Sequence, residues 1–182
     1  MTGQEARAAG GTICDLGAVC AAEVLSVRLG MPVSSDGVAE LGRRGLLPVT
    51  GYYKGFPLYD GHALEAFTDA AAATEATWAG QLRTADQAAR YLRIRRTDLD
   101  HLTRAGLLAP VSWCRGPYDR RGTRSVPLYR TGDLDQLTTA PGIDWAAVRA
   151  TPKGRRSPLV RLPGRPAAPA PTEEVSRHDR TA

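Results

Sequence analysis

The sequence contains few cysteines and few aromatic residues. Three of its 182 residues are cysteine, Cys14, Cys20 and Cys114, and no two of them form a CxxC pair. This spacing indicates neither a disulfide framework nor a zinc site. Apolar residues make up 42% of the chain but aromatic residues only 6%, which suits one ordinary domain or two small ones with modest cores.

Long apolar runs are also missing from the sequence. No stretch of about 18 apolar residues occurs, so no membrane span is expected. The first residues, MTGQEARAAGG, lack the basic patch and apolar core of a secretory signal. We therefore expect a protein of the reducing cytoplasm, associated with the nucleoid if its partner is DNA, and we expect no membrane partner.

Recognisable catalytic patterns are absent as well. His62, His101 and His178 lie far apart in the sequence, and the carboxylates are scattered without a pairing suited to acid–base chemistry. No glycine-rich loop of the Walker type is present to cradle a phosphate. The sequence therefore predicts no enzyme, no metal site and no cofactor.

The charge of the chain is moderately basic. It has 24 Lys and Arg against 19 Asp and Glu, a net charge of +5, and a sequence pI near 9.4. Such a balance fits a polyanionic partner, although charge alone does not identify one. Residues 85–137 hold ten arginines against six aspartates, whereas residues 22–67 hold four basic against five acidic residues. We expect the later segment to dominate binding to a polyanion.

Two candidate units divide the chain, and the first spans residues 14–70. Apolar residues at helical spacing predict a helix that starts at Cys14 and ends before Gly30. N-cap residue types then precede a second helix that ends at Gly45. The first unit is thus predicted to begin as helix, turn, helix.

A hairpin and a third helix are expected to complete the first unit. The extended runs 46–49 and 56–59 flank a glycine-bearing turn, which predicts two paired strands. Pro57 predicts that the second strand lies at a sheet edge, because proline cannot donate to a strand ladder. Asp60 is expected to cap the helix that follows.

The second unit spans residues 84–150 and begins with a similar pattern. Thr84 and Gln87 have the spacing of a capping box, and apolar residues at helical spacing predict a helix to Leu92. Residues 95–97 are expected to form the turn before a second helix that ends at Gly106.

A second hairpin and two short helices should follow. Residues 107–111 and 126–129 are the predicted strands, separated by a long loop rich in Arg and Gly. Thr131 is expected to cap the next helix, and Asp144 a last helix whose Trp145 packs against the second unit.

A repeat relates the two units. Arg44-Gly45-Leu46-Leu47 corresponds to Ala105-Gly106-Leu107-Leu108, Pro57-Leu58-Tyr59 to Pro127-Leu128-Tyr129, and Leu64 and Phe67 to Leu134 and Leu137. Differences in length between the copies fall in loops, which duplicated structure tolerates. The sequence therefore predicts two copies of one supersecondary unit.

The second copy resembles the winged helix-turn-helix domains of the MerR and phage-excisionase superfamily. The similarity covers about 50 residues and rests on Ala88-Ala89-Arg90-Tyr91-Leu92, Gly106-Leu107-Leu108, Leu128-Tyr129 and Asp133-Leu134, and the first copy matches more loosely. The resemblance implies a mainly α fold with small β-hairpin wings (α+β), arranged as tandem winged helix-turn-helix domains. It also implies double-stranded DNA as the partner.

In that superfamily the second helix docks in the major groove and the wing follows the phosphate backbone. By position, the resemblance assigns DNA contacts in the second unit to Arg95, Arg96, Thr97, Asp98, His101 and Arg104 on the helix, and to Arg115, Arg120, Arg121 and Arg124 on the wing. In the first unit it assigns them to Ser34, Ser35, Arg43 and Arg44, with Tyr52, Tyr53 and Lys54 on the wing. Asp98 and Asp100 depart from the pattern of that superfamily. A carboxylate at the start of the second helix stabilises the helix N-terminus, or accepts a hydrogen bond from the amino group of a cytosine, but it also repels phosphate.

The function implied is that of a transcriptional regulator or an excisionase-like accessory or architectural factor. The alternative is an adaptor that keeps the fold without reading DNA, which the acidic residues on both second helices favour. Its partner would be a second copy of the chain or another DNA-bound protein.

The remaining segments are expected to lack a core of their own. Residues 1–13 are predicted as a flexible leader, and residues 71–83 as an alanine-rich linker that can be helical up to about Gly80. Residues 151–182 are predicted as a basic, proline-rich disordered tail. Between Arg149 and Arg165 there are five arginines and one lysine without an acidic residue, which suits an electrostatic arm.

Overall fold

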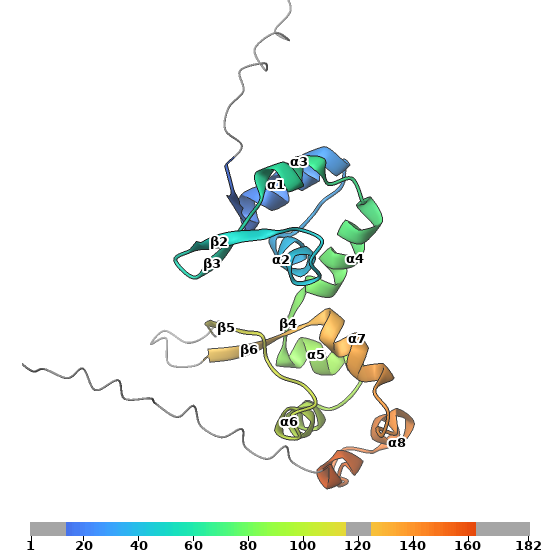
Figure 1. The fold of residues 1–182 in the computed structure, drawn as a ribbon. Helices are drawn as coiled ribbons and strands as arrows, with labels where there is room; N and C mark the ends of the chain where they lie inside the picture. The colour runs from blue at the N-terminus through green and yellow to red at the C-terminus, as the bar shows by residue number, and fades with distance from the viewer. Residues whose placement is uncertain (1–13, 116–124, 163–182) are drawn as a thin grey trace, which may run out of the picture.

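The computed structural model describes residues 14–115 and 125–162, arranged as two units that follow one another along the chain (Figure 1). In this part the protein is α+β, as predicted, with eight α-helices and two three-stranded antiparallel sheets. None of the helices described is long and apolar enough to cross a membrane.

The first unit is a small sheet with three helices. Its elements are β1 (Leu16–Gly17), α1 (Ala18–Leu29), α2 (Ser35–Arg43), β2 (Val49–Tyr53), β3 (Phe56–Tyr59) and α3 (Gly61–Ala66). The Ser34 hydroxyl caps α2 by accepting from the N–H of Gly37, and Asp60 caps α3, as its sequence position predicted. Lys54 and Gly55 have φ of 50° and 82°, values that suit a tight turn between β2 and β3.

The second unit repeats this order of elements and adds two more at its end. They are β4 (Leu82–Thr84), α5 (Ala85–Leu92), α6 (Arg96–Arg104), β5 (Ser112–Arg115), β6 (Ser125–Arg130), α7 (Thr131–Thr139), α8 (Trp145–Ala150) and the 3-10 helix η1 (Pro158–Arg161). The predicted capping box of Thr84 and Gln87 is confirmed, and Asp144 caps α8 as expected.

The strand registers of the two sheets match. Leu58 pairs with Gly17 on one side and Gly51 on the other, and its counterpart Leu128 pairs with Thr84 and Ser112. In both sheets the last strand lies between the other two. The repeat predicted from the sequence is therefore confirmed in topology and in register.

Equivalent residues also build the two cores. Five pairs of residues occupy equivalent positions in the two units and are buried in both. They are Val38 and Leu99, Leu41 and Leu102, Leu47 and Leu108, Tyr59 and Tyr129, and Leu64 and Leu134. Gly45 and Gly106 end α2 and α6 with φ of 74° and 71°, a left-handed conformation that glycine adopts without a steric penalty.

The strand predictions need two corrections. Strands β1 and β4 were not predicted, and their presence makes β3 and β6 central, so the prediction that Pro57 confines its strand to an edge is wrong. Pairing with β1 reaches only Tyr59 and Leu58, so Pro57, which lacks an N–H, lies beyond the end of that ladder. The runs 46–49 and 107–111 also mostly precede their strands, because Leu47 and Leu108 point into the cores.

Residues 71–83, predicted as a linker that can be helical up to about Gly80, do contain such a helix, α4 (Ala70–Gly80), which is followed by β4. The prediction of a linker without a core is wrong, because α4 packs into the first core. Ala73 and Ala76 are fully buried in the first core, and Asp69 caps the helix by accepting from the N–H of Ala72. Small side chains let α4 lie close against α2, which gives this helix a tertiary contact that composition alone does not indicate.

Residues 151–162 are packed, so the prediction that disorder begins at residue 151 is wrong for them. Ser157 caps η1 by accepting from the N–H of Leu159, and Pro158 occupies the first helical position. Leu159 is only 4% exposed and belongs to the second core. The leader 1–13 and residues 163–182 of the predicted tail lie outside the described residues.

The two units meet where α4 packs against α7. A Cβ on Gly132 of α7 would lie 3.1 Å from the Cβ of Ala79. Thr131 does not cap α7 as predicted, since the N-cap is Arg130. Instead the N–H and the hydroxyl of Thr131 both donate to the carbonyl of Gln81 at 3.0 Å.

Charged and aromatic contacts reinforce this junction. The Arg83 guanidinium lies over the rings of Trp78 and Tyr91, 5.6 and 4.5 Å from their centroids. Arg130 of the second unit is 3.7 Å from the carboxylate of Glu40 in the first. With the units joined in this way, the β2–β3 and β5–β6 hairpins extend toward the same side in the view of Figure 1.

Candidate nucleic-acid interface

The outward face of α6 presents polar side chains to solvent. Leu99 and Leu102 turn one side of the helix into the second core, where both are fully buried. Arg96, Thr97 and Arg104 are exposed on the opposite side. Three of the residues predicted to contact DNA thus share one accessible helix face.

The arginines of this face form solvent-exposed contacts, which water screens. Arg96 contacts the carboxylates of Asp100 and, at 3.5 Å, of Asp86. Arg104 donates from Nη1 to Nδ1 of the half-buried His101 at 2.9 Å. Exposed pairs of this kind contribute little to stability, so a phosphate or a base edge can replace them at low cost.

Arg95 and Asp98 differ from the other residues predicted to contact DNA, because they bond to each other within the protein. Asp98 is fully buried and accepts from Arg95 Nε and Nη2, both at 2.9 Å. Burial opposes ionisation of Asp98, but hydrogen bonds from Arg95 and Ser157 outweigh it and lower the pKa of the carboxyl. Asp98 therefore leaves the set of candidate DNA contacts, and Arg95 serves a structural role.

Arg93 is a residue that the sequence did not single out. It ends α5 with φ of 57°, and the equivalent helix α1 ends at Gly30 with φ of 65°. A side chain in the left-handed region costs about 1 kcal/mol, and such strain gathers at functional sites. The exposed Arg93 side chain lies in the turn just before α6.

The β5–β6 hairpin carries the predicted wing of the second unit. Arg115, at the end of β5, is exposed, and Trp113 keeps 59% of its surface accessible. Arg120, Arg121 and Arg124 lie outside the described residues, so their predicted contacts stay predictions.

Helix α2, the counterpart of α6, is covered along one side by α4. A Cβ on Gly37 would lie 2.6 Å from Oγ1 of Thr77, and one on Gly80 would lie 2.3 Å from the carbonyl oxygen of Asp36. The two helices therefore touch through their backbones. Ser34 is engaged as the cap of α2, and the neighbouring Ser35 is half-buried.

Arg43 and Arg44 are bound to carboxylates. Glu40, only 3% exposed, accepts from Arg43 at 2.5 and 2.8 Å and from Arg44 at 2.8 Å, and Arg44 also bonds to Glu75 at 2.9 Å. Burial opposes ionisation of Glu40, but these two arginines outweigh it and lower the pKa of the carboxyl. The two arginines at the end of α2 are thus paired with carboxylates, whereas Arg104 at the end of α6 bonds to the ring of His101.

The β2–β3 hairpin is aromatic rather than basic. Tyr52, Tyr53 and Phe56 are 72%, 62% and 73% exposed. The Lys54 ammonium lies 5.2 Å from the centroid of the Tyr53 ring. These predicted wing residues are accessible, but they offer a single positive charge.

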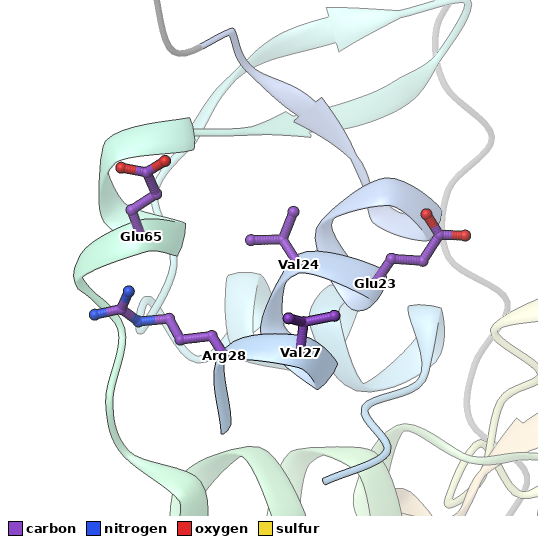
Figure 2. A pocket seen from close by; sticks show the side chains of 5 residues that line it. All are labelled: Glu23, Val24, Val27, Arg28 and Glu65. Atoms are coloured by element: carbon purple, nitrogen blue, oxygen red, sulfur yellow. The ribbon is translucent and has the colours of Figure 1, made fainter. Parts of the chain in front are cut away.

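A shallow hollow on the first unit, between α1 and α3, has mixed charge. Figure 2 shows its lining residues, Glu23, Val24, Val27, Arg28 and Glu65. Two carboxylates against one arginine do not suit a polyanion. Across the described ranges, histidine, cysteine and carboxylate side chains do not gather in groups of three that could hold a metal ion.

Five further cations lie in the packed C-terminal part, and sequence reasoning assigned them only to a disordered arm. They are Arg149, Lys153, Arg155, Arg156 and Arg161, all exposed. Their placement could have been anticipated from the Ser157-Pro158 helix start and the apolar residue after it.

No protein-family model matches this sequence, and no similar protein is found among curated proteins or among solved structures. The winged-helix resemblance therefore rests on the residues of this chain alone.

Proposed function

We propose that this chain is a double-stranded DNA-binding protein of tandem winged helix-turn-helix architecture, acting in the cytoplasm as a transcriptional regulator or an excisionase-like accessory factor. The observation that carries the proposal is the accessible outward face of α6, with Arg96, Thr97 and Arg104 on one side of the helix. A helix of this diameter fits the major groove, and arginine is the side chain most often bidentate to guanine.

In this proposal the two units have unequal roles. Helix α6 reads base edges, while the β5–β6 hairpin contacts phosphates next to it. Helix α2 contributes little, because α4 covers part of it and Glu40 binds Arg43 and Arg44. The first unit then acts as a fixed neighbour of the reading unit.

Arg104 and Arg43 occupy equivalent positions and offer a matched test. Footprinting on fragments of the source genome would locate a site, and fluorescence anisotropy would measure affinity for it. We expect Arg104→Ala to weaken binding about tenfold or more and to relax base preference at one position. Arg43→Ala should change affinity less than threefold. Equal losses for both variants, or none for Arg104→Ala, would contradict the proposal.

A second candidate function is a protein-interaction adaptor. The exposed aromatic side chains of the β2–β3 hairpin favour it, since Tyr and Phe are enriched in protein interfaces. Replacing Tyr52 and Phe56 with serine separates the two functions. An adaptor would lose its partner, while DNA binding through α6 would persist.

A further inference from the structure

The segment formed by residues 149–162, called here the C-terminal segment, is fixed on the second unit by several contacts. Arg95 Nη1 donates to the carbonyls of Pro152 and Arg155, at 3.2 and 2.9 Å. Ser157 lies near the buried Asp98 and helps to lower the pKa of its carboxyl. Leu159 inserts into the second core with 4% of its surface exposed. The segment is therefore held at the N-terminal end of α6.

The charge of the C-terminal segment is entirely positive. It contains five exposed cations, named above, and no Asp or Glu. None of the ion pairs found among the described residues involves any of the five. The nearby carboxylate of Asp98 is already bound by Arg95. Within residues 14–115 and 125–162, the positive charge of this surface is therefore not neutralised by an ion pair.

This surface continues into the turn before α6. The Arg95 that binds the segment is also the N-cap of α6, and the exposed Arg93 and Arg96 lie on either side of it in sequence. The positive end of the α6 dipole points the same way. Cations from two parts of the chain, about 60 residues apart, are thereby brought to the N-terminal end of α6.

We propose that the C-terminal segment is a phosphate-binding surface that holds the DNA backbone beside the groove entered by α6. Arg95 and Asp98 are its positioning residues and do not contact DNA. This inference rests on the proposed function. Several exposed cations on one short segment suit neighbouring phosphates of a DNA strand, and such contacts carry no sequence information.

The first test uses the full chain with Lys153, Arg155 and Arg156 all changed to glutamine. We expect affinity to fall about tenfold or more, equally on the footprinted duplex and on an unrelated duplex of the same length. The slope of log affinity against log salt should become shallower by roughly 3, as for three lost phosphate contacts. The control changes Arg28, an exposed cation of the first unit to which no DNA contact is assigned, to glutamine and should stay within threefold of the wild type.

A second test separates a docked surface from a flexible arm. Leu159→Ala removes the buried anchor without changing any charge, and circular dichroism checks that the variant is folded. The proposal predicts a threefold to tenfold loss of affinity, whereas an arm that binds when undocked would keep wild-type affinity and would overturn the docking.

The outcomes distinguish failure of this inference from failure of the proposed function. If the wild type binds DNA and Arg104→Ala weakens it, but the triple glutamine variant binds both duplexes with wild-type affinity and salt slope, the C-terminal segment is not a phosphate-binding surface. If the wild type binds neither duplex, both proposals are overturned.

Discussion

Arg95 and Asp98 form a two-point ion pair across the first turn of α6, with Nε–Oδ2 and Nη2–Oδ1 distances of 2.9 Å. The third guanidinium nitrogen bonds to the carbonyls of Pro152 and Arg155. One side-chain pair thus joins the start of α6 to a segment far along the chain. This arrangement assigns Arg95 a role inside the protein, although its position in the sequence suggested a phosphate contact.

We expect Asp98→Ala to lower the free energy of unfolding by about 2 kcal/mol, because a buried carboxylate that accepts several charge-assisted hydrogen bonds is lost. Urea unfolding followed by circular dichroism measures the change. Asp100→Ala, on the exposed side of the same helix, is the control and should stay within about 0.5 kcal/mol of the wild type. Equal effects for the two variants would contradict the role given to Asp98.

The same pair predicts a dependence of stability on acidity. The folded-state pKa of Asp98 is lowered, so its ionised form stabilises the fold above the unfolded-state pKa of about 4. That contribution is lost as the pH falls below this value and through the folded-state pKa. The free energy of unfolding should therefore decline in acid less steeply for Asp98→Asn than for the wild type. Parallel curves would refute this explanation.

Arg93 predicts opposite effects on stability and binding. Glycine occupies the equivalent left-handed position in the first unit, so Arg93→Gly relieves strain and should leave stability unchanged or raise it by up to about 1 kcal/mol. DNA affinity should fall, because an exposed cation beside α6 is removed. Thermal unfolding and anisotropy test the two effects. A less stable variant with wild-type affinity would show that Arg93 serves the fold instead.

The close approach of α4 to α2 predicts a steric effect at Gly80. A Cβ there would lie 2.3 Å from the carbonyl oxygen of Asp36, so Gly80→Ala should cost about 2 kcal/mol or more as the helices separate. Gly51→Ala is the matched control, since a Cβ at Gly51 meets nothing within 4 Å. Thermal unfolding compares the two. Similar melting temperatures for the two variants would mean that the contact between α2 and α4 leaves room for a methyl group at residue 80.

Local signals in the sequence predicted the parts of the fold that depend on neighbouring residues. The caps at Asp60 and Thr84 and the chain reversals at Gly45 and Gly106 depend on side chains or backbone within a few residues, and all of them are found. The internal repeat then gave the order of elements. These features need no knowledge of distant contacts.

Features that depend on distant contacts were missed. Strand β4 has three residues and exists because β6 pairs with it more than 40 residues later. The helix of α4 was expected as far as Gly80, but its packing was not, because its burial depends on contact with α2. The sequence does not distinguish the roles of Arg95 and Arg96, which are adjacent arginines at the start of α6. In the structure Arg95 bonds to a carbonyl of the C-terminal segment, whereas Arg96 pairs with the exposed Asp100.

The dependence of DNA affinity on salt tests the central claim most directly. The association constant of the full chain for a duplex carrying its footprinted site is measured by anisotropy over a range of salt concentrations. If about six phosphates are neutralised, log affinity falls linearly with log salt with a slope of roughly −5. A flat response, or no binding at low salt, would contradict the claim that this protein binds DNA through its second unit.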